Sequence, residues 1–116
     1  MHTVVESPEY LRQVERLLSE REHQALVDYL AEHPKAGVIM RGTGGIRKLR
    51  WARAGMGKRG GVRVTYYYHN EQMPLYLLTV FSKGAKDDLA PSERHALRAL
   101  VRMLIETWRR PHEQSV

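Results

Sequence analysis

The chain contains no cysteine, and this absence excludes disulfide frameworks and thiolate zinc sites. A cysteine-free composition fits a reducing compartment. No apolar run reaches the roughly 18 residues that a membrane-spanning helix requires. The first ten residues, MHTVVESPEY, also lack the basic and apolar regions of a secretory signal. We therefore expect a cytoplasmic protein that does not enter a membrane.

Acidic residues are missing from one long stretch of the sequence. Between His33 and Asn70 there is no Asp or Glu, although this stretch holds nine Lys and Arg residues. Residues 1–32, in contrast, carry seven acids and three bases. The net charge of +6 is therefore concentrated in the middle of the chain. Such a patch is typical of proteins that bind nucleic acid or phosphate groups. A solvated surface without a partner is the alternative interpretation.

Several familiar catalytic patterns are absent as well. Neither glycine-rich stretch ends in the Gly-Lys-Ser/Thr of a phosphate-binding loop, and the glycines precede strands, unlike those of a dinucleotide fingerprint. The acid-free stretch offers no carboxylates for a paired-acid mechanism. The six histidines show no metal-ligand spacing. We expect neither a metal nor a cofactor, which leaves cations and phenols as candidates for chemistry.

The first third of the chain predicts a strand followed by two helices. With 116 residues we expect a single domain, over residues 1–116. A β-branched run at 3–6 predicts the strand, and Ser7-Pro8 predicts the start of a helix. Ser19 and Glu22 fit a capping box, at which one helix ends and another begins. The two helices should pack together on one face of a sheet.

The remainder predicts three strands, over 46–52, 62–69 and 75–82, joined as an antiparallel meander, and a last helix from Pro91. A loop is expected over 35–40 and a glycine-rich turn over 54–61. The fold class is thus α+β, a small twisted and mostly antiparallel sheet with the order β-α-α-β-β-β-α. The residues expected to be largely buried are Leu49, Trp51, Val64, Tyr66, Leu77 and Trp108.

One face of the 62–69 strand carries Arg63, Thr65 and Tyr67, and these residue types suit a phosphodiester. Guanidinium groups bind phosphate oxygens in bidentate fashion and stabilise the extra charge of a pentacoordinate transition state. A lysine whose pKa is lowered by neighbouring cations can transfer a proton. A tyrosine ring can stack on an unpaired base. For Tyr67, stacking and core packing both remain open.

Three separated blocks of sequence, GTGGIRKLRWA, GKRGGVRVTYYY and LYLLTVFSKGAKDDL, occur in the order found in a known family. They resemble the RelE/HigB-type toxins of type II toxin–antitoxin modules, in particular the HigB-like branch of the RelE superfamily. The resemblance implies a compact RelE-like α+β fold and a ribosome-dependent mRNA endoribonuclease (an mRNA interferase). Such an enzyme cuts mRNA in the ribosomal A site without a metal, by attack of the ribose 2′-hydroxyl on the adjacent phosphate. It also implies a cognate antitoxin, often a helix-turn-helix protein.

The resemblance also implies roles for individual residues. Lys58 matches the loop lysine of the family, and Arg59 follows it. Arg63 matches the strand arginine that contacts the scissile phosphate, and Lys83 matches a basic residue of the third block. The catalytic candidates are therefore Lys58, Arg59, Arg63 and Lys83. The RNA-binding candidates are Arg47, Lys48, Arg50, Arg53, Tyr67 and Lys86.

The third block departs from the family pattern at Phe81, Gly84 and Ala85, where Tyr, Asn and Glu are usual. The identity of the general acid and base is therefore open. Two other functions use the same patch. One is a non-catalytic RNA- or ribosome-binding module, and the other is a protein-interaction domain that receives an acidic partner.

Overall fold

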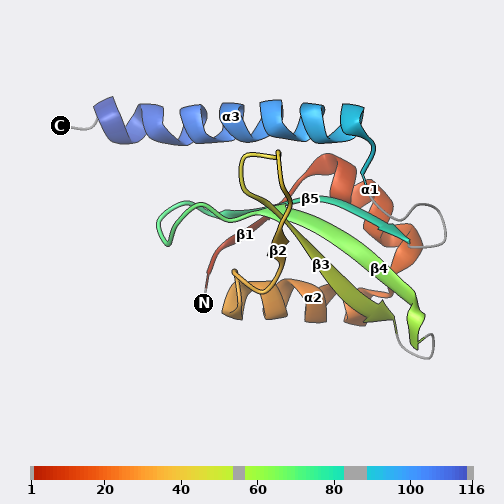
Figure 1. Ribbon diagram of the computed structural model, residues 1–116. Helices are drawn as coiled ribbons and strands as arrows, with labels where there is room; N and C mark the ends of the chain where they lie inside the picture. The colour runs from red at the N-terminus through yellow and green to blue at the C-terminus, as the bar shows by residue number, and fades with distance from the viewer. Residues whose placement is uncertain (1, 54–56, 83–88, 115–116) are drawn as a thin grey trace.

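The computed structural model describes residues 2–53, 57–82 and 89–114, with the backbone alone at 53, 57–60 and 111–114 (Figure 1). The elements are β1 (Val4–Glu6), α1 (Pro8–Leu17), α2 (Glu20–Glu32), β2 (Val38–Ile39), β3 (Ile46–Arg53), β4 (Gly57–Tyr67), β5 (Leu75–Ser82) and α3 (Pro91–Gln114). The sheet has the strand order β1-β5-β4-β3-β2. Among the described strands, only the pair β1–β5 is parallel; the other pairs are antiparallel. The predicted α+β class and the β3-β4-β5 meander are therefore confirmed.

Local capping residues set the limits of the first two helices. The Ser7 hydroxyl accepts a hydrogen bond from the backbone N–H of Tyr10 at 3.2 Å, with Pro8 in the first turn. At α2, the Ser19 hydroxyl accepts from the N–H of Glu22, and the Glu22 carboxylate accepts from the N–H of Ser19. Both halves of the predicted capping box are present, so α1 ends before Ser19 and the chain turns directly into α2.

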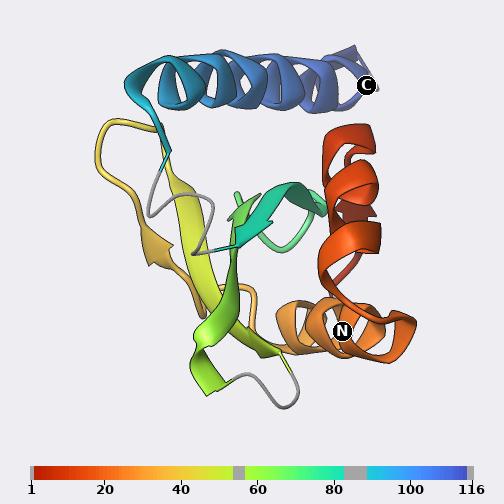
Figure 2. The ribbon, with the colours of Figure 1, turned by 90° about the vertical axis from the view of Figure 1, so that its right-hand side faces the viewer.

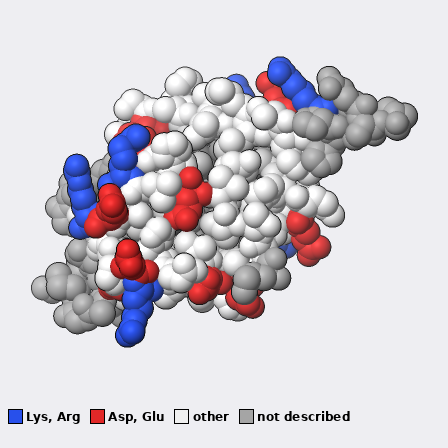
Figure 3. Space-filling view, turned by 180° about the vertical axis from the view of Figure 1, so that it is seen from behind, with Lys and Arg blue, Asp and Glu red and all other residues white. Residues whose placement is uncertain are grey.

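The first core lies between the sheet and the α1–α2 pair, which covers one face (Figure 2). Seen from the side of α1 and α2, the surface carries both acidic and basic side chains (Figure 3).

The residues of the first core have little or no exposed surface: Tyr10, Val14, Leu18, Leu26, Leu30, Val62, Val64, Tyr66, Leu75, Leu77 and Val80. The predicted burial of Val64, Tyr66 and Leu77 is confirmed. Leu49 and Trp51 are only half-buried, because β2 pairs with β3 at Arg47 and Lys48 and leaves the rest of β3 as a sheet edge.

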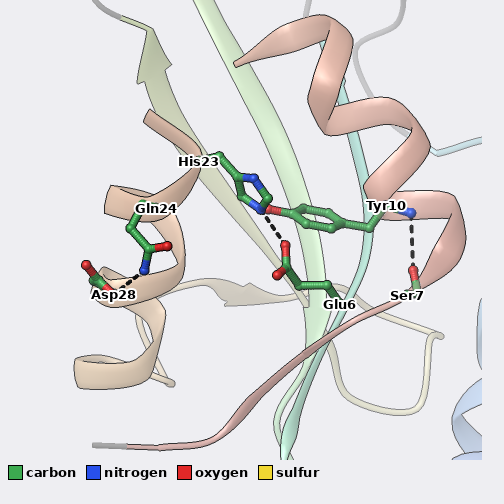
Figure 4. A network of polar contacts seen from close by, with 6 residues as sticks. All are labelled: Glu6, Ser7, Tyr10, His23, Gln24 and Asp28. Carbon is green, nitrogen blue, oxygen red and sulfur yellow. Dashed lines mark hydrogen bonds and ion pairs between the residues drawn. The ribbon is translucent and has the colours of Figure 1, made fainter. Parts of the chain in front are cut away.

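Polar groups join β1, α1 and α2 beside this core (Figure 4). Glu6 of β1 forms an ion pair with His23 of α2, and Gln24 donates to Asp28 along α2 at 2.8 Å. The Tyr10 ring lies beside His23, with ring centroids 5.6 Å apart. The Tyr10 hydroxyl is buried without a hydrogen-bond partner, and burial raises its pKa above the usual value of 10.0.

The second core forms where α3 crosses the opposite face at one end of the sheet. There Leu97 and Val101 of α3 pack with apolar residues of β3, β4, β5 and the adjoining loops. Trp108 is half-buried rather than fully buried, with its ring edge-to-face to that of His69. The β3–β4 hairpin extends away from α3 at the other end (Figures 1 and 2). No helix in the described ranges is long and apolar enough to cross a membrane.

Two connecting segments differ from the prediction. The expected 35–40 loop contains the two-residue strand β2, because the Tyr66 hydroxyl accepts a hydrogen bond from the N–H of Gly37 at 2.7 Å. The expected 54–61 turn is shorter, because β4 already begins at Gly57. The described glycines with positive φ instead include Gly42, Gly44 and Gly45, in the loop that precedes β3.

Candidate phosphate-binding site

Arg63 occupies the middle of β4 on the face opposite the first core. Its neighbours along the strand, Val62 and Val64, belong to that core, so the alternation of β4 directs Arg63 to the other side. Across the sheet it pairs with Arg50 of β3 and Phe81 of β5. Arg63, Thr65 and Tyr67 therefore share a face, as predicted.

The Arg63 side chain is buried without a counter-ion. The side chain as a whole is 5% exposed; within the described ranges no hydrogen bond or ion pair joins its guanidinium to another residue, and its nitrogen atoms are not fully buried. A cation that is largely removed from water and has no anionic partner lowers stability. The residue does line a depression of about 240 Å³, together with Arg50, Trp51, Ala52 and Gly61. An anion bound in this depression would supply the missing charge.

A second cation stands directly opposite. Arg50 is the cross-strand partner of Arg63, and it is exposed. Like charges at directly opposite positions destabilise a sheet, since the two Cβ atoms are only about 5 Å apart. Gly61 contributes no side chain to the same depression, which leaves room for a ligand to approach the backbone. Two guanidinium groups around one space are suited to bidentate binding of a phosphate.

Thr65 and Lys48 form the next row of this face towards α3. They are cross-strand partners, and Thr65 is fully buried. The hydroxyls of Thr65 and Thr79 are hydrogen-bonded at 2.5 Å, so β5 holds Thr65 in place. Lys48 is half-buried beside them. This row separates the arginine pair from the apolar core under α3.

Tyr67 does not occupy the position that base stacking would need. Its side chain is 5% exposed and belongs to the core under α3. Its hydroxyl is hydrogen-bonded to Nδ1 of His69 at 3.0 Å. Burial raises the pKa of Tyr67, although the positive charge of Arg109 opposes that increase. Of the two interpretations left open by the sequence, the structure supports core packing.

Arg47 also lies away from the depression. It pairs with Tyr66 and so points to the face opposite Arg63. Its guanidinium donates to the carbonyl oxygens of Gly37, at 2.8 Å, and Lys35, at 3.3 Å. These bonds hold the segment that enters β2 and keep the Arg47 guanidinium away from the depression.

Three other candidates lie on the same β3–β4 hairpin as Arg63. Arg53 pairs with Gly57 across the β3–β4 hairpin, and Lys58 and Arg59 follow on β4; their side chains are not described. Lys83 and Lys86 lie outside the described residues. Strand β5 ends at Ser82, which pairs with Val62 next to the Arg63–Phe81 pair.

Trp51 is the member of the site that sequence reasoning assigned to the core alone. It lines the depression, yet it also packs at the margin of the first core. The signal available in the sequence was its position next to Arg50 within the basic stretch. Among the described residues no cluster of three or more His, Asp or Glu could hold a metal ion.

Comparison with known proteins supports the fold. No family model matches the chain. A solved structure with a similar fold is the toxin RelE of E. coli in the free state, a mutant with two arginines replaced by alanine. It has 19% sequence identity and a TM-score of 0.52, over 74% of this chain and 87% of that chain. The predicted RelE-like fold is therefore confirmed, while the HigB-like branch stays a prediction.

Proposed function

We propose that this protein is the toxin of a type II toxin–antitoxin module, and that it acts as a ribosome-dependent mRNA endoribonuclease of the HigB-like branch. The observation that carries the proposal is Arg63, an arginine that is 5% exposed, has no counter-ion among the described residues and lines a depression shared with Arg50. The RelE-like fold supports the same conclusion. The proposed substrate is mRNA on the ribosome, and the proposed partner is a cognate antitoxin with a helix-turn-helix domain.

The proposed reaction needs charge stabilisation and two proton transfers, and no metal. The ribose 2′-oxygen attacks the adjacent phosphorus and loses its proton to a base, while the bond from phosphorus to the 5′-oxygen breaks and that oxygen gains a proton. The products are a 2′,3′-cyclic phosphate and a 5′-hydroxyl. Arg63, with Arg59, stabilises the charge on the phosphoryl oxygens.

Lys58 and Lys83 are the proposed proton carriers. Tyr67 is a poor alternative, since its side chain is 5% exposed and its hydroxyl is hydrogen-bonded to His69. Arg50 and Lys48, on the same face as Arg63, are proposed to hold the RNA backbone near the reacting phosphate. Arg53 and Lys86 remain further RNA-binding proposals.

The test replaces Arg63 by alanine and measures mRNA cleavage on purified ribosomes and growth arrest on expression. We expect cleavage to fall by about 10²–10³-fold, as for loss of another preorganised donor. Ribosome co-sedimentation should weaken far less, because eight of the nine central cations remain. Arg63→Lys should recover little activity, because a point charge does not reproduce the guanidinium fork. Arg16→Ala, an exposed change on α1, is the matched control.

Two results would contradict the proposed site. Undiminished cleavage by Arg63→Ala would place the chemistry elsewhere. A parallel loss of ribosome binding and cleavage would favour the non-catalytic binding module. Mapping of the cut ends tests the mechanism itself, because 2′-hydroxyl attack requires 5′-hydroxyl and cyclic-phosphate termini.

A further inference from the structure

Three aromatic side chains form a continuous row that begins at the Arg63 depression. Trp51 lines that depression. Its ring centroid lies 5.3 Å from that of Tyr29 on α2, and the Tyr29 centroid lies 4.8 Å from that of His33 at the end of α2. We call Trp51, Tyr29 and His33 the aromatic row.

The far end of the aromatic row opens into a second depression, of about 420 Å³. Tyr29 and His33 line it together with Tyr68 and Lys35, and Glu71 is the acidic residue among its lining residues. The Lys35 carbonyl is held by Arg47, so the backbone at this end is fixed. A depression at each end, one lined by two arginines and the other by Lys35 and Glu71, and the rings between them make one path over the surface.

Core packing does not account for the whole aromatic row. Trp51 is half-buried against the first core, but Tyr29 is 39% exposed and His33 is exposed. Exposed rings are common singly, whereas contiguous ones often mark interaction sites. Trp51 contacts Tyr29, Tyr29 contacts His33, and a depression lies at each end of this row. The arrangement indicates a ligand with several flat groups.

The path crosses an open edge of the sheet. Strand β2 pairs with β3 at Arg47 and Lys48, so within the described ranges no strand covers the outer edge of β3 from Leu49 onward. Arg50 and Trp51 are consecutive and point to opposite faces of β3. A chain of nucleotides bound at Arg63 and Arg50 can therefore pass over this edge and reach the aromatic row.

We propose that the aromatic row binds the unpaired RNA that continues from the nucleotide held at Arg63; this inference rests on the proposed function. Its bases stack on Trp51, Tyr29 and His33, while Arg50 and Lys35 contact its phosphates. Proteins that bind single strands combine stacking rings with a basic path in this way, at about 1–3 kcal/mol per stacked base. The aromatic row thus takes the stacking role that the buried Tyr67 does not fill.

The test uses Trp51 as its own reporter. Trp108→Phe leaves Trp51 as the single tryptophan, and the probe is a 2′-O-methyl adenosine hexanucleotide, which lacks the attacking hydroxyl. We expect the hexanucleotide to quench Trp51 fluorescence and to bind at least about 10-fold more tightly than a 2′-O-methyl adenosine dinucleotide, which is too short to cover the aromatic row. Tyr29→Leu and His33→Ala should each weaken hexanucleotide binding by about 5–150-fold. His95→Ala, an exposed change on α3, is the matched control and should leave binding unchanged.

Hexanucleotide binding that neither quenches Trp51 nor responds to Tyr29→Leu would overturn the proposal and place the RNA on another surface. Absence of binding would overturn it as well. If Tyr29→Leu lowers the melting temperature, the effect on binding is judged from His33→Ala instead, because His33 is exposed and its loss should not disturb the fold. The assay contains neither ribosomes nor a cleavable bond, so it is independent of the cleavage test. Quenching by a protein that cuts no mRNA would support the aromatic row while contradicting the proposed catalysis.

Discussion

The two faces of β4 are equally buried but chemically opposite. Val62, Val64 and Tyr66 point into the first core, where α1 and α2 cover them. Arg63 and Thr65 point to the other face and are also buried, with 5% and 0% exposure. On the first face apolar contacts with the helices account for the burial. On the second face, Thr79 of β5 holds Thr65 by a hydrogen bond. No described residue forms an ion pair with Arg63.

This difference separates residues that maintain the fold from residues that serve a ligand. A buried apolar side chain contributes to stability through the surface that it removes from water. A buried cation without a counter-ion lowers stability, so its presence requires another explanation. Substitutions on the two faces should therefore have opposite effects on folding, and the following predictions test this contrast in order of size.

The largest loss of stability is expected from Leu77→Ala. Leu77 is fully buried in the first core, and truncation of such a residue costs about 2–5 kcal/mol through lost contacts and the cavity left behind. Chemical denaturation with urea measures the loss. A cost below about 1 kcal/mol would show that the first core is not the stabilising one.

A smaller loss is expected from Tyr66→Phe. The Tyr66 hydroxyl accepts a hydrogen bond from the buried N–H of Gly37, which the phenylalanine ring cannot replace. Leaving that N–H unpaired should cost about 1–3 kcal/mol. Amide hydrogen exchange at Gly37 should accelerate at the same time. Unchanged exchange would mean that the bond does not hold β2 in place.

Tyr10→Phe removes a buried tyrosine hydroxyl as Tyr66→Phe does, but we do not expect it to lower stability. The Tyr10 hydroxyl is buried and has no hydrogen-bond partner, so its removal should leave stability unchanged or raise it by about 1 kcal/mol. Because burial raises the folded-state pKa of Tyr10, only the unfolded chain ionises it just above pH 10. The wild type should therefore lose stability as the pH rises above 10, and Tyr10→Phe should lose less. Melting temperatures at pH 8 and pH 11 provide the comparison.

The smallest effect on folding is expected from Arg63→Met. Arg63 has no counter-ion among the described residues, so replacing it by an apolar side chain of similar length should keep the free energy of unfolding within about 1 kcal/mol of wild type, or raise it. The same variant should lose mRNA cleavage. A large destabilisation would instead assign Arg63 to the fold and weaken its proposed role at the phosphate.

Local signals were sufficient to predict much of the fold. The start of α1 at Pro8 and the change to α2 at Ser19 follow from side chains within four residues of each helix start. Strand alternation correctly grouped Arg63 with Thr65 and Tyr67. Strand β2 could not be predicted in the same way, because its position depends on a bond between Gly37 and Tyr66, 29 residues apart.

The site was harder to predict than the fold, because it depends even more on contacts between residues that are far apart in the sequence. Alternation gives the face of a residue but not what covers that face. Tyr67 and Arg63 share one side of β4, yet α3 covers the first and leaves the second beside a depression. Arg47 shows the same limit, since its bonds to the 35–37 segment require a fold that brings distant carbonyl groups to it.

The parallel pairing of β1 with β5 has a consequence for the time at which the protein completes its fold. Val4 pairs with Leu75, and the Ser7 hydroxyl donates to the carbonyl oxygen of Leu78, 71 residues later. During synthesis the apolar faces of α1 and α2 emerge long before the strands that bury them. We expect the β3-β4-β5 meander, whose contacts are local, to form first, and β1 to join last. The nascent chain would then expose Tyr10, Leu26 and Leu30 until β5 has left the ribosome.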